Sequence, residues 1–250
     1  VVDGGTIASS GVVGRLSFEH VVCGQQVCSG PTISLESLGE LRLNPCAIAS
    51  NVVLEPELIM RELKGSDGGL LCDVTTVDEG RDVDGLARIA QKNRIPIAYG
   101  ASVPSSTSNA RTAESSLRRE LEVGQRRAAF ITLRLPVEDA VLEGASRASE
   151  KNGALVVVTL QAAATIDEFF DEATRVVERF GKKRLLIRSP NRIAPRLLSR
   201  LGCFVLVDGF GRPIERTATP DFDMDDKESL RALFDEVEDD SHLLVSVFNT

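Results

Sequence analysis

Eight short runs of apolar residues divide this chain, and each is paired with a stretch of helical character. The runs are Arg15–Val22, Gly69–Asp73, Ile95–Tyr99, Ala128–Leu135, Ala154–Leu160, Arg184–Ser189, Cys203–Gly209 and Leu243–Phe248. They are rich in Val, Leu and Ile, which is typical of strands buried on both faces of a parallel sheet. Eight strands alternating with helices predict an α/β fold, a closed (β/α)8 TIM barrel. In that fold the chemistry lies at the carboxyl ends of the strands.

Local signals support this alternation. Thr165–Glu168 has a capping-box sequence, and apolar residues follow it at helical spacing through Phe169–Phe180. Asp225 opens another predicted helix, and the Ser- and Pro-bearing stretch Ala101–Asn109 predicts a loop directly after the third run. The length of 250 residues matches one barrel, so we expect a single domain over residues 1–250.

Composition narrows the classes of partner. The net charge is −8, Trp is absent and Tyr99 is the only Tyr, so the chain lacks the basic patches and stacking platforms of nucleic-acid binding. No stretch approaches the ~20 apolar residues of a membrane span. We therefore predict neither nucleic acid nor a membrane as a partner.

The five cysteines show no CxxC spacing, and their odd count favours reduced thiols. Cys72 and Cys203 lie in apolar runs and are predicted to be buried as small hydrophobic side chains. We therefore expect a reducing intracellular compartment. We expect the cytoplasm. The chain begins at Val1 rather than Met, so an organelle is the alternative if an upstream targeting segment was removed.

Four stretches, in collinear order, resemble the phosphotriesterase-related proteins, which belong to the phosphotriesterase-like branch of the amidohydrolase superfamily. They are Gly14–His20 (GRLSFEH), Gly68–Thr76 (GGLLCDVTT) with Gly80–Asp82, Leu201–Phe204 leading to Asp208–Gly211, and Asp221–Asp226 leading to Leu243–Val245. The resemblance spans nearly the whole chain. It implies a barrel hydrolase in which two metal ions share a hydroxide that attacks phosphotriesters, lactones or related esters.

The metal ligands that the resemblance implies are mostly missing from this sequence. Of six ligand positions, only His20 matches. The other five fall on Phe18, Leu133, Thr159, Ser189 (or Arg188 if the alignment shifts by one) and Phe248. The only other histidine, His242, precedes the eighth run, at the wrong end of a barrel strand for its site. We therefore predict no metal site, no cofactor and no catalytic residue.

Four residues are left as a possible pocket: His20, Asp73, Arg188 and Asp208. His20 could join Asp73 or Asp208 in a mononuclear site, or be a satisfied structural histidine. Asp208 could be catalytic, or could accept backbone N–H groups in its glycine-rich loop. Arg188 could bind an anion in the barrel mouth, or could form an ion pair with Asp73 or Glu19.

These observations predict a catalytically degenerate phosphotriesterase-like barrel that acts as a scaffold, an assembly subunit or a ligand-binding module. The alternative is a residual mononuclear or metal-free hydrolase of phosphotriester- or lactone-type esters that uses His20 and Asp208. Only Asn249 and Thr250 follow the eighth run, so we expect this chain to lack the helix that would cover this flank of the barrel, or that helix to lie in a further segment of the protein. We expect a protein partner, a second copy of the chain or a further segment of this protein to cover that apolar flank.

Overall fold

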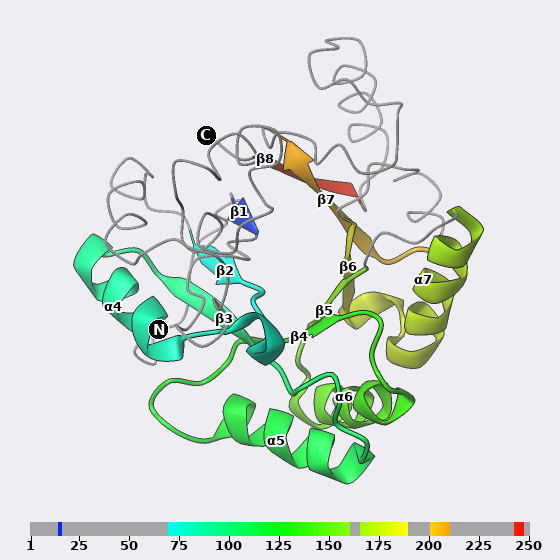
Figure 1. The fold of residues 1–250 in the computed structure, drawn as a ribbon. Helices are drawn as coiled ribbons and strands as arrows, with labels where there is room; N and C mark the ends of the chain where they lie inside the picture. Colours follow the sequence, from blue (N-terminus) through cyan, green and yellow to red (C-terminus); the bar gives the residue numbers. More distant parts are fainter. Residues whose placement is uncertain (1–14, 17–69, 161–165, 190–200, 211–242, 248–250) are drawn as a thin grey trace, which may run out of the picture. The chain divides into compact units, whose positions relative to one another are not determined.

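The structure, a computed structural model, describes residues 15–16, 70–160, 166–189, 201–210 and 243–247 (Figure 1). The chain divides into two compact units. The first unit holds residues 1–100 and 215–217, and the second holds residues 101–214 and 218–250.

All eight apolar runs contain a strand, as the hydrophobic pattern predicts. The strands are β1 (Arg15–Leu16), β2 (Leu71–Asp73), β3 (Ile97–Ala101), β4 (Phe130–Arg134), β5 (Val156–Thr159), β6 (Leu185–Ser189), β7 (Phe204–Phe210) and β8 (Leu243–Val247). Every strand pairing within each unit is parallel. The α/β class with a parallel sheet is therefore confirmed. Closure into a complete barrel and the single-domain organisation stay predictions.

In the first unit, β2 pairs with β1 on one side and with β3 on the other. After β2 the chain forms the short 3-10 helix η2 (Val77–Glu79) and then α4 (Val83–Asn93). The side chain of Asp82 caps α4 by accepting a hydrogen bond from Gly85 N at 2.9 Å. The apolar stripe of α4 is buried, which fixes the segment that leaves the carboxyl end of β2.

In the second unit, the strands follow the order β4–β5–β6–β7–β8. The loop predicted after the third run is confirmed, since residues 102–109 connect β3 to α5 (Ala110–Glu122). Two more helices, α6 (Asp139–Asn152) and α7 (Ile166–Phe180), and the 3-10 helix η3 (Lys182–Arg184) connect the following strands. Figure 1 shows α5, α6 and α7 on one side of β4–β7.

The strands β4, β5 and β6 have two chemically different faces. Residues in register on neighbouring parallel strands have their side chains on the same face. One face carries only aliphatic side chains: Ile131, Leu133, Val156, Val158, Leu185 and Ile187, all buried. The opposite face carries Thr132, Val157 and Leu186, and then Arg134, Thr159 and Arg188 near the carboxyl ends. The charged side chains of these three strands, Arg134 and Arg188, therefore lie on one face and near one end.

Close packing holds the helices of the second unit together. At Gly144 of α6, a Cβ atom would lie 2.6 Å from Ala110 O and 2.6 Å from Ala113 Cβ of α5, so the two helices approach at a distance that only glycine allows. Ion pairs connect the outer surfaces: Lys151 with Glu114 between α6 and α5, and Arg175 Nη1 with Asp139 Oδ1, 2.6 Å apart, between α7 and α6. Close packing and ion pairs thus connect the three helices in sequence.

In the part of the chain that the structure describes, no helix has both the length and the apolar character needed to cross a bilayer. The prediction for the two strand cysteines is confirmed: Cys72 and Cys203 are buried, free thiols.

Candidate functional site

The carboxyl ends of β4, β5 and β6 present two arginines on either side of a threonine. The register places Arg134 of β4 beside Thr159 of β5, and Thr159 beside Arg188 of β6. We call these three residues the arginine row. Leu206 of β7, which is buried, continues the register next to Arg188. The row thus has two guanidinium groups on the polar face and an apolar side chain at one end.

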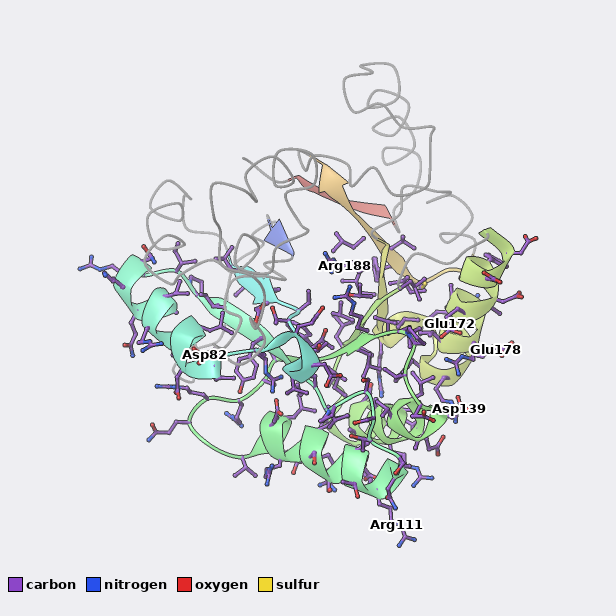
Figure 2. The ribbon with its side chains drawn as sticks, viewed as in Figure 1. Asp82, Arg111, Asp139, Glu172, Glu178 and Arg188 are labelled. Atoms are coloured by element: carbon purple, nitrogen blue, oxygen red, sulfur yellow. The ribbon has the colours of Figure 1, made fainter. Side chains whose placement is uncertain are left out.

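Arg188 is the most unusual member of the row because only 1% of its surface is exposed. Its Nη1 donates to the hydroxyl oxygen of Thr159 at 3.5 Å. Its own backbone oxygen accepts from Leu160 N at 3.1 Å, which joins the ends of β5 and β6. Figure 2 shows the Arg188 side chain on the side of the strands away from α6 and α7. A permanent cation is therefore held inside the protein on the polar face of the sheet.

Register corrects one expectation from the sequence. The alignment equates Leu133 with the fourth-strand ligand position. Leu133, however, pairs with Val158 and lies on the aliphatic face. Arg134, like Thr132 two residues before it, lies on the same face as Thr159 and Arg188, and Arg134 is the residue of β4 in register with both. The physical reason is that both faces of this strand are buried at its centre, so the run of apolar residues does not reveal which face each residue occupies.

Arg134 was missed by the sequence analysis, although a weak signal was present. In the fourth run, Thr132 and Arg134 are two residues apart among apolar neighbours. A spacing of two places both on one face of a strand. Polar residues at this period, close to the end of a buried strand, mark the polar face of β4.

In the first unit, the carboxyl end of β2 carries a buried acid. Asp73 is 3% exposed, and its Oδ1 accepts hydrogen bonds from Thr75 Oγ1 at 2.6 Å and Thr75 N at 3.3 Å. Burial raises the pKa of Asp73 from 3.8 to about 6, although the bonds from Thr75 and the charge of Arg81 oppose the rise. The nearby Glu79 carboxylate adds to the rise. Asp73 therefore changes its charge near neutral pH.

A cation and an aromatic ring lie beside this acid. The guanidinium of Arg81 stacks over the ring of Tyr99, 5.4 Å from its centroid, and also donates to the backbone oxygen of Gly100. Tyr99 of β3 is in register with Asp73 of β2 and is buried. The end of β2 and β3 is thus a compact polar cluster in which Arg81 is fixed by the ring and by the backbone.

The described residues do not fit the two-metal centre that the resemblance implies. Metal ions of this kind need imidazole, carboxylate or thiolate ligands, whereas the arginine row offers two guanidinium groups that have no lone pair to donate. Among the described residues, no group of three or more His, Cys, Asp and Glu side chains could hold a metal ion. The chemistry of the row is that of an anion site rather than of a cation site.

Of the four residues predicted as a pocket, the structure describes the side chains of two, Asp73 and Arg188. Asp73 belongs to the first unit and Arg188 to the second, so their predicted ion pair stays a prediction. Asp208 lies in β7, and its side chain is outside the described part of the structure, as is the whole of His20. The predicted positions of Phe18 and Phe248 also fall outside the described residues, as does the capping role of Thr165.

An open hollow of about 450 Å³ lies elsewhere in the second unit, and its lining comprises Ser105, Ser106, residues 136–139 and Arg175. Two of its charged groups, Arg175 and Asp139, already pair with each other. None of the predicted site residues lines it. The arginine row is therefore the stronger candidate for a functional site in this unit.

No protein-family model matches the sequence, and no curated protein matches it either. Solved structures do match over nearly the whole chain. A phosphotriesterase homology protein from Escherichia coli, crystallised with phosphate in its active site, has a TM-score of 0.63 at 15% identity, covering 95% of this chain and 83% of that chain.

Two further neighbours agree. A triple mutant of an organophosphorus hydrolase from Deinococcus radiodurans has a TM-score of 0.62 at 18% identity, covering 94% of this chain and 76% of that chain. A lactonase from Listeria monocytogenes has a TM-score of 0.62 at 15% identity, covering 94% and 78%. These likenesses show the fold alone: the chain has a fold similar to that of these three proteins.

Proposed function

We propose that this chain is a phosphotriesterase-like (β/α)8 barrel that has lost the two-metal hydrolase centre and works by binding a ligand. The observation that carries the proposal is the buried Arg188, whose guanidinium donates to Thr159 at 3.5 Å. The resemblance equates Thr159 with a histidine ligand on the fifth strand. It equates Arg188, or the adjacent Ser189, with a histidine ligand on the sixth.

Electrostatics argue against a metal centre beside this residue. Arginine stays protonated at any pH at which proteins fold. A divalent cation about 5 Å from a guanidinium would be repelled by roughly 6–7 kcal/mol at an effective dielectric constant of about 20. Arg134, on the same face of the sheet, would add to this repulsion. The arginine row would therefore disfavour metal ions at this end of the sheet.

Among the binding roles, the row supports ligand binding better than a purely structural role. A scaffold has no need of a buried cation, because an apolar side chain at this place would avoid the cost of desolvating the charge. The partner that we expect along the barrel flank after the eighth strand is a separate proposal. The mass in solution of the 250-residue chain tests it, and a monomer at high concentration would argue against it.

The proposal is tested by metal content and by turnover. The chain is purified in excess zinc beside the Deinococcus organophosphorus hydrolase, which serves as the positive control. Elemental analysis is expected to give well under one zinc per chain for this protein. Assays against aryl phosphotriesters and lactones, with added zinc or manganese, are expected to give no turnover above background. Two metal ions per chain, or metal-dependent turnover, would contradict the proposal.

A residual hydrolase is the second candidate, and the buried Asp73 is the observation that favours it. A carboxyl with a pKa of about 6 at a strand end has the proton affinity of a general base at neutral pH. This candidate predicts ester hydrolysis that survives chelation of metal ions and disappears in Asp73→Asn. Absence of metal-independent hydrolysis of lactones and aryl esters would remove it.

A further inference from the structure

We infer that the amino-terminal ends of β5, β6 and β7 form a docking surface for a short acidic segment of a partner protein that carries apolar side chains. We call the five residues of this surface the amino-end patch: Leu155, Lys182, Lys183, Arg184 and Phe204. They all belong to the second unit and lie at the opposite ends of the strands from the arginine row. The inference is therefore independent of the ligand proposed for that row.

The apolar part of the patch is two large side chains that remain in contact with water. Leu155 directly precedes β5 and is 39% exposed, and Phe204 opens β7 and is 42% exposed. Among the described residues, Val123 is the one other large apolar residue that is exposed to this degree. Val157 and Leu186, further along β5 and β6, are buried. Apolar surface is therefore left open at the amino ends of these strands.

The register places these two residues on one face of the sheet. Phe204 pairs with Leu186, and Leu186 pairs with Val157. Leu155 lies two residues before Val157, and its backbone oxygen accepts from Ile131 N at 2.9 Å, so the ladder between β4 and β5 reaches it. The alternation of a strand then puts Leu155 on the same face as Phe204. With β6 between them, they are separated by two strand spacings, about 10 Å across the sheet, and form one patch rather than two isolated contacts.

Cations lie beside Phe204. The 3-10 helix η3 leads into β6 and consists of exposed residues: Lys182, Lys183 and Arg184. The Lys182 side chain lies against Gly202, two residues before Phe204, since a Cβ atom at Gly202 would be 3.3 Å from both Cδ and Nζ of Lys182. Positive charge therefore borders the patch on the side of β7.

A further cation lies beside Leu155. Leu185 of β6 is in register with Val156 of β5, so the residues directly before them, Arg184 and Leu155, are neighbours. A hydrogen bond of 3.4 Å from Arg184 Nη1 to Ser149 O joins the guanidinium to the end of α6. The two apolar side chains thus have positive charge between and beside them.

This positive charge contrasts with the rest of the molecule, which has a net charge of −8. Exposed cations on the outer helices pair with carboxylates, as Arg147 and Arg179 both do with Glu143. The described segments at the amino ends of β5–β7, residues 153–155, 181–184 and 201–204, contain three cations and no carboxylate. The patch therefore combines apolar surface with a local positive potential, to which an acidic partner is complementary.

An acidic protein segment fits this surface better than a lipid bilayer. More than half of the surface of Leu155 and of Phe204 is buried, so neither side chain projects far enough to insert below lipid headgroups. A net charge of −8 would also repel the anionic bilayers to which exposed lysines bind. Two apolar side chains provide far less than the ~800 Å² per partner of a stable interface. A short segment in a transient complex matches that size.

The test selects peptides from a random phage-displayed library on the full 250-residue chain. We expect enrichment of sequences that combine Asp or Glu with Leu, Phe or other apolar residues. A synthetic copy of an enriched peptide should bind with an affinity that falls as salt is added, as measured by fluorescence anisotropy. Failure to enrich any peptide, or enrichment of basic or uncharged peptides, would overturn the inference.

Variants locate the binding on the patch. Phe204→Ser is expected to weaken binding of the peptide about tenfold or more, because a central apolar contact is lost. Lys183→Glu should weaken it as well and reduce its salt dependence. Arg111→Glu makes the same change of charge at an exposed position in the first turn of α5, where the side chain points away from the strands (Figure 2), and should leave binding unchanged.

Circular dichroism checks the folding of each variant. If Phe204→Ser does not fold, Lys183→Glu still decides the question, because Lys183 is exposed. Equal binding of the peptide by Lys183→Glu and Arg111→Glu would overturn the inference.

Two further measurements test the other possible occupants. Sedimentation velocity is expected to give the same mass for wild type and Lys183→Glu, and neither is expected to bind mixed phosphatidylcholine and phosphatidylserine vesicles. A dimer that Lys183→Glu dissociates would show that a second copy occupies the patch and would overturn the inference. Vesicle binding that Lys183→Glu abolishes would overturn it in favour of a membrane surface.

Discussion

Each of the two units has an ionisable side chain buried at a strand end, and the two side chains respond to burial in opposite ways. In the first unit, the end of β2 carries a carboxyl, Asp73, whose pKa rises to about 6 because it is buried. In the second unit, the ends of β4 and β6 carry Arg134 and Arg188 on either side of Thr159. A buried carboxyl can shed its charge by taking a proton, whereas a guanidinium cannot lose its proton. The first end therefore responds to pH, and the second stays positive.

This difference bears on function because neither end, as described, supplies the ligand set of a two-metal hydrolase. At the end of β2, Thr75 donates hydrogen bonds to the Asp73 carboxyl, and the charge of Arg81 acts on it. At the ends of β4–β6 the polar groups are donors of hydrogen bonds rather than donors of electron pairs. The fold by itself therefore does not fix the chemistry at these strand ends.

The largest effect that would test the comparison is the pH dependence of stability. The pKa of Asp73 is higher in the folded chain, about 6, than its ordinary value of 3.8. Stability from this group is therefore fully present below pH 3.8 and is lost as the pH rises through 6, by up to about 3 kcal/mol. Asp73→Asn should remove this loss, as measured by urea unfolding at pH 4, 5, 6 and 7.

Two controls make this experiment specific to Asp73. Asp84→Asn, at an exposed position in the first turn of α4, should keep the wild-type slope between pH 4 and 7. Arg134→Gln in the second unit should also keep it, because arginine does not titrate in this range. Parallel curves of unfolding free energy against pH for wild type and Asp73→Asn would contradict the claim that the Asp73 end of the first unit responds to pH.

A smaller effect is expected from Arg81, which connects the acid to the aromatic ring. Arg81→Leu removes the stacking on Tyr99 and the hydrogen bond to Gly100, at a cost of about 1–2 kcal/mol in the free energy of unfolding. It also removes a charge that holds the pKa of Asp73 down, so that pKa should rise above 6. Urea unfolding measures the first change, and carbon-13 NMR titration of the carboxyl measures the second.

The matched control for this change is Arg88→Leu. The Arg88 side chain is 69% exposed, and it lies 3.7 Å from Asp82 in a loose surface pair. Its loss should alter stability by no more than about 0.5 kcal/mol. An unchanged pKa of Asp73 in Arg81→Leu would show that the charge of Arg81 does not lower the pKa of Asp73.

The sequence predicted the strands well and the site only in part. All eight strands lie in apolar runs because Val, Leu and Ile suit a sheet buried on both faces. The same burial conceals which face each residue occupies, so Leu133 was taken for the counterpart of a ligand and Arg134 was overlooked. The register with the neighbouring strand decides which face of the sheet a side chain occupies. Register is a property of the folded sheet and cannot be read from the local composition of one strand.

The raised pKa of Asp73 is a second property that the sequence could not provide. The motif around Gly68–Thr76 locates an acid at the end of the second run, and that position is confirmed. Its proton affinity, however, depends on how deeply the folded chain buries it, on the hydrogen bonds from Thr75 and on the charges of Arg81 and Glu79. Such shifts arise from tertiary packing.

The smallest predicted effect concerns Thr159, the neutral member of the arginine row. Thr159→Val replaces the hydroxyl with a methyl group of similar size, so it removes the acceptor of the Arg188 Nη1 hydrogen bond with little change in packing. Since that bond is long, at 3.5 Å, we expect a loss of about 1 kcal/mol in the free energy of unfolding. Thr159→Ser, which keeps the hydroxyl, should retain the hydrogen bond. Urea unfolding of both variants measures these effects. A valine variant as stable as wild type would show that the threonine only fills space beside Arg188.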